Sequence, residues 1–132
     1  MQPRLSHCLS VTLLALAPLF CSPHPVAEQA GSAHRPFHGT ATWFLPNLGA
    51  CGEVSSEADH IIAMNTPQYK SGGHCHKNVV IKNKANGKSV VAKVLDECPS
   101  CGYGCLDLSP SVFKALGNLE DGVLPIAWQW TG

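Results

Sequence analysis

The chain is poor in charge and has no long apolar segment. Only 14% of its 132 residues are Asp, Glu, Lys or Arg, and the formal net charge is zero. This balance argues against nucleic acid or an anionic membrane surface as the main partner, because such partners attract an excess of positive charge. The apolar run Leu9–Phe20 is too short to span a bilayer. The sequence also lacks an Asn-x-Ser/Thr sequon, so it gives no sign of N-glycosylation.

The N-terminal segment has the pattern of a secretory signal peptide. Arg4 precedes the apolar run, whose 12 residues match the length of the apolar part of such a signal. We predict that residues 1–21 are removed, with a second partial cleavage pattern near Ala27 leaving the exact boundary open. Pro18 argues against the alternative of a buried helix. The mature protein is therefore expected to be secreted and extracellular.

The remainder of the chain divides into two parts by composition. Residues 22–36 carry three prolines and few large apolar side chains, which predicts a flexible lead-in. Residues 37–132 have an ordinary globular composition and room for one domain. No repeat or low-complexity tract is present.

Short β-prone runs separated by turn residues dominate this domain. Asn86-Gly87 favours a tight hairpin between two of them. Ser109–Gly117 supplies a Ser cap, a Pro at the first helical position, an apolar face and a final Gly, which predicts a two-turn helix. Closure of so many short strands removes their exposed edges, so we predict a small closed β-barrel. The β-prone runs are 39–45, 60–64, 78–83, 89–95, 106–108 and 123–130.

Two carboxylates border one loop in the second half of the chain. Asp96 ends a run rich in β-branched residues, and Asp107 lies in the short apolar segment that follows the loop. Loops held by a rigid scaffold often carry function, so a ligand is expected to meet these two groups. Five cysteines remain after signal removal, and in an exported domain they predict disulfides with one thiol left over.

The chain contains several short motifs in a characteristic order. They are Gly-Thr-Ala-Thr-Trp-Phe (39–44), Gly-Ala-Cys-Gly (49–52), Asn-Gly-Lys-Ser-Val-Val (86–91), Val-Leu-Asp-Glu-Cys-Pro (94–99) and Leu-Asp-Leu-Ser (106–109). Together they resemble the double-psi β-barrel superfamily, which includes the first domain of expansins, barwin and the rare-lipoprotein-A type lytic transglycosylases. The resemblance is greatest to small, single-domain, expansin-like fungal proteins of the loosenin type. It implies a mainly β fold: a six-stranded double-psi β-barrel with one or two short helices, stabilised by disulfides.

The resemblance also implies a function and a site. Expansins carry an Asp-Leu-Ser whose Asp is needed for wall loosening, a second Asp before the loop and a Thr in the first strand; these fall on Asp107, Asp96 and Thr42. Trp43 or Tyr103 is expected to stack on a sugar ring. The implied function is binding of a cell-wall polysaccharide (cellulose, chitin or another glucan) and loosening of the wall without hydrolysis. The chain has no second, carbohydrate-binding domain, so weak affinity for cellulose is expected.

For each of two enzymatic alternatives, glycoside hydrolysis and lytic transglycosylation, the chain lacks one of the required catalytic residues. Glycoside hydrolysis normally uses two carboxylates about 5 to 9.5 Å apart. Asp107 matches the acid of the family 45 endoglucanases, but residues 40–50 contain no acidic residue to match their base. For the lytic transglycosylases, Glu53 matches the required Glu, whereas Asn65 stands where their His is expected. We therefore predict that the protein is not a hydrolase and has no catalytic residue. If one residue were catalytic, it would be Asp107.

A different class of function is protein binding. Some small secreted double-psi barrels inhibit papain-like cysteine proteases or act at a host interface. The loop Glu97–Gly104 contains a proline and two cysteines, and a rigid loop of this kind lowers the entropic cost of docking. Either function is compatible with a monomer, which we expect.

The resemblance pairs Cys51 with Cys75, as in expansins. Among Cys98, Cys101 and Cys105, the first two can pair with each other or one of them with Cys105, and the sequence leaves this open. Related sequences often have another residue at Cys105, which makes it the candidate free thiol.

Two further chemistries were considered for these cysteines. Cys98-x-x-Cys101 resembles a thioredoxin-type redox pair, but no βαβ pattern surrounds it. His74-Cys75-His76 suggests zinc, yet three adjacent residues of one strand cannot all face one metal. We expect no cofactor and no metal.

Overall fold

The computed structural model describes Pro18 and residues 34–132. The predicted signal peptide and most of the predicted lead-in therefore lie outside the described residues. In the part of the chain that is described, no helix has both the length and the apolarity needed to cross a bilayer.

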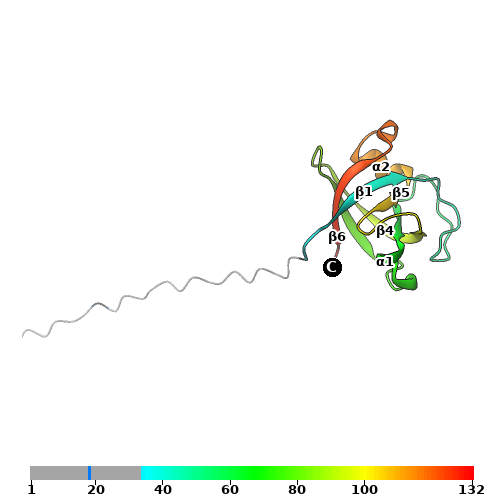
Figure 1. Ribbon diagram of the computed structural model, residues 1–132, viewed down its shortest axis with the longest axis horizontal. Coiled ribbons are helices and arrows are strands. Elements are labelled where there is room, and N and C mark those ends of the chain that lie inside the picture. The colour runs from blue at the N-terminus through cyan, green and yellow to red at the C-terminus, as the bar shows by residue number, and fades with distance from the viewer. Residues whose placement is uncertain (1–17, 19–33) are drawn as a thin grey trace, which may run out of the picture. The chain divides into compact units, whose positions relative to one another are not determined.

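Six strands close into a barrel (Figure 1), as the sequence predicts. Around the barrel their order is β1-β5-β2-β4-β3-β6. The pairs β1–β5 and β2–β4 are parallel, and the other four pairs are antiparallel. The strands are β1 (Phe37–Trp43), β2 (Ile61–Asn65), β3 (Asn78–Asn83), β4 (Ser89–Cys98), β5 (Leu106–Leu108) and β6 (Leu124–Trp130).

Short helical segments connect some of the strands. They are α1 (Thr66–Tyr69) and the 3-10 turn η1 (Lys70–Gly72) after β2, and α2 (Pro110–Leu116) and the 3-10 turn η2 (Leu119–Asp121) between β5 and β6. The predicted hairpin joins β3 to β4, and Gly87 adopts a φ of 76° in its turn. The predicted barrel with one or two short helices is thus confirmed.

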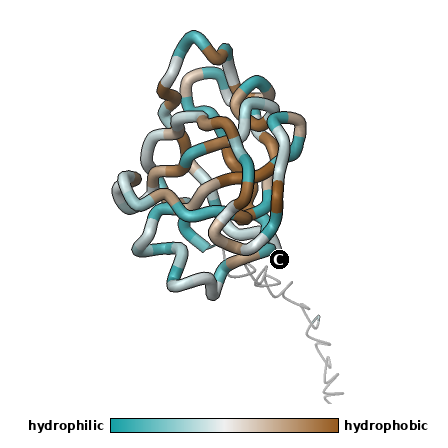
Figure 2. Tube along the Cα trace, turned by 90° about the vertical axis from the view of Figure 1, so that its right-hand side faces the viewer, coloured by the Kyte–Doolittle hydropathy of each residue, from teal (hydrophilic) through white to brown (hydrophobic). Residues whose placement is uncertain are grey.

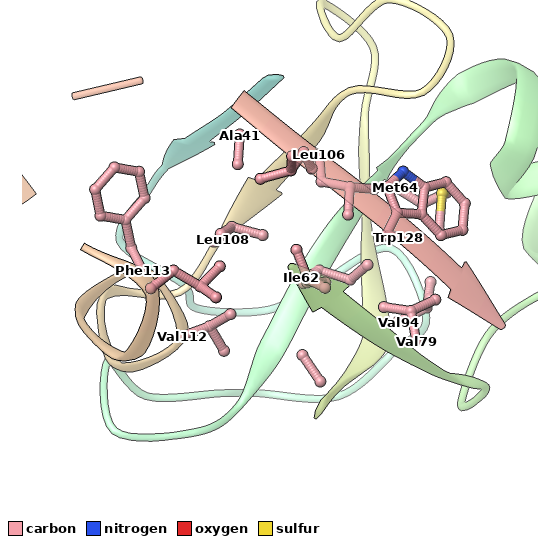
Figure 3. Packing of buried hydrophobic residues seen from close by; sticks show 14 of the residues in the cluster. Ala41, Ile62, Met64, Val79, Val94, Leu106, Leu108, Val112, Phe113 and Trp128 are labelled. Atoms are coloured by element: carbon pink, nitrogen blue, oxygen red, sulfur yellow. The ribbon is translucent and has the colours of Figure 1, made fainter. Parts of the chain in front are cut away.

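Alternation along the strands fills the barrel with apolar side chains. Figure 2 shows that the hydrophobic parts of the trace lie in the middle of the barrel. Figure 3 shows Ala41, Leu106 and Leu108 meeting Ile62 and Met64 inside it. All five are at most 1% exposed, so this interior is closed to water.

Helix α2 contributes to the same core. Val112, Phe113 and Leu116 from its apolar face are fully buried. Ser109 stands at the predicted cap position, but its hydroxyl donates to the carbonyl of Asp59 at 2.6 Å instead of accepting from the helix. The hydroxyl therefore joins α2 to the loop before β2 and leaves the helix without a side-chain cap.

A β-bulge in β4 decides which way Asp96 points. Ile62 pairs with Val94 and the next residue, Ala63, pairs with Asp96, so Leu95 is the extra residue. Without this bulge, Asp96 would share the inward side of Val94, because successive strand residues alternate between faces. The bulge turns the carboxylate to the outside of the barrel and leaves Leu95 buried.

Two loops approach strands so closely that they require glycine. In the loop between β4 and β5, Gly104 lies against the backbone of His38 and Gly39 of β1, and a Cβ on either glycine would overlap the other segment. In the loop between β1 and β2, a Cβ on Gly49 would overlap the carbonyl of Leu95 in β4. Each loop is thus held against the strand that precedes the other loop.

Disulfides fix both loops. Cys51 is bonded to Cys75, as the resemblance implied, and this bond closes a separation of 24 residues. A disulfide of that span stabilises a fold by about 3 kcal/mol, because it lowers the conformational entropy of the unfolded chain. Cys98 is bonded to Cys101, and Cys105 is a free, half-buried thiol. The pairing that the sequence left open is thereby resolved.

The close approach of Gly39 and Gly104 makes a sharp prediction. Gly39→Ala is expected to lower the free energy of unfolding by at least about 3 kcal/mol or to prevent folding, because the new methyl overlaps backbone atoms that cannot move alone. Gly102→Ala is the control. Gly102 lies in the same loop as Gly104 but has open space around it, so this variant should unfold like the wild type. Urea unfolding of both variants measures the free energy of unfolding. Equal stability of the two variants would contradict the close approach of Gly39 and Gly104.

Candidate functional site

Four side chains form a row across the outside of the barrel. Thr42 on β1 pairs with Asp107 on β5, Asp107 pairs with Ala63 on β2, and Ala63 pairs with Asp96 on β4. Residues that are opposite each other on neighbouring strands point to the same face. The two carboxylates therefore flank one small side chain, with their Cα atoms two strand spacings, or about 10 Å, apart. Three predicted site residues, Thr42, Asp96 and Asp107, are brought together.

Asp107 is half-buried and supported by a hydroxyl. The Thr42 hydroxyl donates to its Oδ1 at 2.9 Å. Burial raises the pKa of Asp107 above its ordinary value, and the charge of Asp96 acts in the same direction. Hydrogen bonds from Thr42 and from the backbone of Leu108 partly oppose this rise in pKa. Asp107 is therefore a carboxyl that holds its proton more tightly than an exposed Asp does.

Asp96 has a different environment. Its Oδ1 accepts from the backbone N–H of Ala50 and from that of Glu97, both at 2.8 Å. The first bond attaches the loop between β1 and β2 to β4, next to the close approach of Gly49 and Leu95. Asp96 thus faces the same side as Asp107, but its carboxylate also anchors a loop.

A shallow groove of about 210 Å³ lies beside Asp107. Its volume is below the roughly 300 to 1,000 Å³ of enclosed small-molecule sites, so it suits a ligand that lies along a surface. Hydroxyl, thiol and carboxyl groups dominate its walls. The lining residues are Thr40, Thr42, Cys98, Ser100, Cys101, Gly102, Cys105, Leu106 and Asp107.

Sequence reasoning missed two members of this groove. Thr40 precedes Thr42 by two positions on β1, and Cys105 precedes Asp107 by two positions, so strand alternation was the signal that places them on the outer face. The Cys105 sulfur lies 3.4 Å from the hydroxyl of Thr40. The free thiol is therefore part of the groove surface.

The two predicted stacking aromatics do not sit in this row. Trp43 is 36% exposed, and its indole N–H donates to the carbonyl of Leu119 at 3.1 Å, on the side of β1 opposite Thr42. Tyr103 is 64% exposed and packs edge-on against Phe37 in the loop that forms one groove wall. Tyr103 is the better placed of the two to reach a ligand in the groove.

Two buried residues, Trp128 and Asn65, have structural roles. Trp128 is 1% exposed, packs in the core and donates its indole N–H to the carbonyl of Gly104. Asn65 is fully buried, and its amide N–H₂ donates to Gln68 and to the carbonyl of Cys105. Asn65 therefore stabilises the start of α1 and the groove wall.

The residues considered for zinc, 74–76, lie in a turn before β3 and not on the strand that was expected, and they point to separate partners. Cys75 is in a disulfide, so it is not a metal ligand. His76 lies 3.2 Å from the carboxylate of Glu53, and the His74 ring packs on Trp130 with centroids 4.5 Å apart. Among residues 34–132, no group of three or more His, Cys, Asp or Glu side chains is arranged to hold a metal.

The family model described as lytic transglycolase, a double-psi β-barrel model, matches residues 37–128. This match runs from the start of β1 into β6 and includes the groove and both Asp residues. The chain belongs to the double-psi β-barrel family.

Proteins from plants and bacteria are similar to this chain in sequence. Putative ripening-related protein 6 of Oryza sativa subsp. japonica is 38% identical over 85 residues, which cover 60% of this chain and 51% of the rice protein. The chain thus spans about half the length of that relative. The papain inhibitor of Streptomyces mobaraensis is 30% identical over 100 residues, covering 70% of this chain and 69% of the inhibitor.

Solved structures agree with the fold. An expansin mutant of Clavibacter michiganensis, in complex with cellohexaose, superposes with a TM-score of 0.67 and 27% identity, covering 74% of this chain and 50% of the expansin. A Streptomyces papain inhibitor superposes with a TM-score of 0.66 and 25% identity, covering 75% of this chain and 96% of the inhibitor. The resemblance to the expansin and barwin superfamily is confirmed, whereas membership of the fungal loosenin group stays a prediction.

The hydrogen bond between Thr42 and Asp107 makes a prediction about the carboxyl. Thr42→Val removes a donor that favours the ionised form, so the pKa of Asp107 is expected to rise further. Thr42→Ser keeps the hydroxyl and should leave the pKa close to that of the wild type. NMR titration of the carboxyl carbon measures both; a pKa that falls or stays constant in the Val variant would refute the assignment.

Proposed function

We propose that this chain is a secreted, expansin-like protein that binds a cell-wall polysaccharide in the Asp107 groove and loosens the wall without hydrolysis. The observation that carries the proposal is a partly exposed carboxylate in an open groove whose neighbours are the hydroxyls of Thr40, Thr42 and Ser100. Carboxylates and hydroxyls are the groups that pair with sugar hydroxyls. The similar expansin in complex with cellohexaose supports the same ligand class.

Several contacts would hold a chain of sugars on this surface. Asp107 accepts a hydrogen bond from a sugar hydroxyl through the oxygen that Thr42 leaves free, and Asp96 offers a second acceptor across Ala63. Tyr103 supplies an exposed ring beside the groove for stacking. Binding along such a surface competes with contacts between neighbouring polysaccharide chains, which is a route to loosening that breaks no covalent bond.

The arrangement of the carboxylates supports a protein that does not hydrolyse. Both acids rise from the same face of one sheet, and residue 42 on β1 is an uncharged Thr. The backbone N–H groups of Ala50 and Glu97 both donate to Oδ1 of Asp96 and fix this carboxylate on the same face as Asp107, whereas the base of an inverting glycosidase lies on the opposite side of the sugar ring from the acid. Asp107 therefore has no partner equipped to complete the reaction.

Neutralising Asp107 should separate binding from stability. Its raised pKa means that the folded state favours the protonated form, so ionisation costs stability above that pKa and stability rises as the pH falls through it. Asp107→Asn keeps an acceptor for Thr42 and is expected to unfold at the same or a slightly higher temperature at neutral pH. Its retention on insoluble cellulose or chitin is expected to fall roughly tenfold.

The same pull-down assay has a pH control and a hydrolysis control. In the wild type, binding should weaken on acidification at a pH above about 3.9, the ordinary Asp value, because the pKa of Asp107 is raised. Soluble sugar released during incubation should not exceed that of a blank. Unchanged retention of Asp107→Asn, or sugar release that this variant abolishes, would overturn the proposal.

A second candidate function is inhibition of a papain-like cysteine protease. The observation in its favour is that the similar Streptomyces papain inhibitor is covered over 96% of its length by the superposition. The structure also offers a surface suited to docking on a protein. In the loop between β1 and β2, which projects from the barrel in Figure 1, Leu45, Leu48 and Val54 are 65%, 68% and 72% exposed.

This projecting loop is internally braced. Leu48 and Val54 form an isolated β-bridge, and the N–H of Ser55 donates to the carbonyl of Asn47 at 3.0 Å. The disulfide at Cys51 ties its tip to residues after α1. A preorganised apolar protrusion loses little entropy on binding, which favours this loop over the predicted loop Glu97–Gly104.

A papain assay tests the second candidate. Leu45→Ser/Leu48→Ser is expected to raise the inhibition constant roughly tenfold, because the partner would no longer gain the free energy of removing these apolar side chains from water. Val91→Ser/Val123→Ser alters two comparably exposed apolar residues elsewhere on the barrel and is the control. Absence of inhibition by the wild type, or an equal effect of both pairs, would exclude this use of the loop.

A further inference from the structure

A second hollow lies over β3 and β6. The Asp107 groove is lined by β1, β5 and the loop between β4 and β5, whereas this hollow is lined mainly by β3 and β6, with His38 of β1 at its edge. Its volume is about 530 Å³. The side chains that define it are those of His38, Val80, Lys82, Lys84, Ala127 and Gln129.

The hollow is positively charged and has no acidic neighbour. Lys82 and Lys84 are exposed on its wall, and the strands β1, β3 and β6 that surround it contain no Asp or Glu. The whole segment 77–95 carries five lysines and no acidic residue. In the region 34–132 the one salt bridge is that between His76 and Glu53, so neither lysine of the hollow is neutralised by a protein carboxylate.

The remaining lining is suited to a polar ligand with a flat underside. Val80 and Ala127 form a partly buried apolar floor. Gln129 and Ser89 are exposed beside it and provide neutral hydrogen-bonding groups. A floor of this kind with cations at its edge fits a sugar ring that bears an acidic group.

We propose that this hollow binds an anionic polysaccharide whose charges are carboxylates, that is, a uronic-acid chain. Single-stranded nucleic acid is normally bound on several exposed aromatic rings. Of the two rings that line this hollow, Trp128 is 1% exposed, which leaves His38 as a single exposed ring. No arginine lines the hollow, whereas the forked guanidinium is the group best matched to phosphate. Two lysine ammonium groups are point charges that suit separate carboxylates along a chain.

The charge of the two faces separates this ligand from that of the first groove. Asp96, Glu97 and Asp107 make the Asp107 side of the barrel acidic, so it repels a polyuronate and suits a neutral chain. The lysine side attracts the acidic chain. One barrel thus takes two kinds of polysaccharide in two hollows with different linings, and the second binding does not depend on the first.

Affinity measurement with polygalacturonate as the probe tests this inference. At low ionic strength, Lys82→Gln/Lys84→Gln is expected to bind it roughly five- to tenfold more weakly than the wild type, and raised salt should reduce wild-type binding. Lys70→Gln/Lys114→Gln removes the same charge from exposed positions outside the hollow and should keep most of the affinity. Asp107→Asn should not weaken the binding of polygalacturonate, whatever its effect on cellulose, because it removes only a repulsive charge.

Two further probes identify the ligand class. Methyl-esterified polygalacturonate, which lacks the charges, should bind much more weakly than the free acid. A single-stranded oligonucleotide of similar charge should also bind more weakly than the polyuronate. The inference is overturned by equal loss in the two lysine pairs, by no loss in Lys82→Gln/Lys84→Gln, by retained binding of the ester, or by tighter binding of the oligonucleotide.

Discussion

The fold depends on two places where backbone touches backbone. At one, the loop after β4 passes over β1 at Gly39 and Gly104; at the other, the loop after β1 passes over β4 at Gly49 and Leu95. Side chains larger than hydrogen do not fit at these glycines, so the two loops and two strands lock each other in place. The groove beside Asp107 takes one wall from the first of these loops, and Ala50 of the second is bonded to Asp96. These two backbone contacts therefore determine the geometry of the site.

The chemistry of the site follows from how each acid leaves the sheet. Asp107 stands between leucines that fill the core, so its carboxyl is half-buried and its pKa is raised. Asp96 faces outward because the bulge at Leu95 reverses the alternation of β4. Ala63 between them is a small side chain and is 3% exposed. An acid that holds its proton tightly and an acid that anchors a loop are together better suited to gripping a ligand than to a paired proton transfer.

Much of this arrangement was predictable from local pattern and resemblance, and some of it was not. The hairpin at Asn86-Gly87, the helix after Ser109 and the proximity of Thr42 to Asp107 follow from turn chemistry, capping signals and the motif order. The direction of Asp96 was not readable from alternation alone, because a bulge is a property of the pairing with Ala63. The lysine hollow also depends on which strands close the barrel, which is long-range information, whereas the direction of Trp43 away from Thr42 follows from alternation along β1.

The thiol of Cys105 gives the groove a chemical property of its own. It is the free cysteine of residues 34–132, and it lines the same surface as Asp107. A molecule bound in the groove covers the sulfur and slows its alkylation. The rate at which a thiol reagent modifies Cys105 therefore reports how much of the groove is occupied, without a labelled ligand. The exposed sulfur can also be oxidised when the purified protein is stored. An oxidised Cys105 would make the surface of the groove bulkier and more polar.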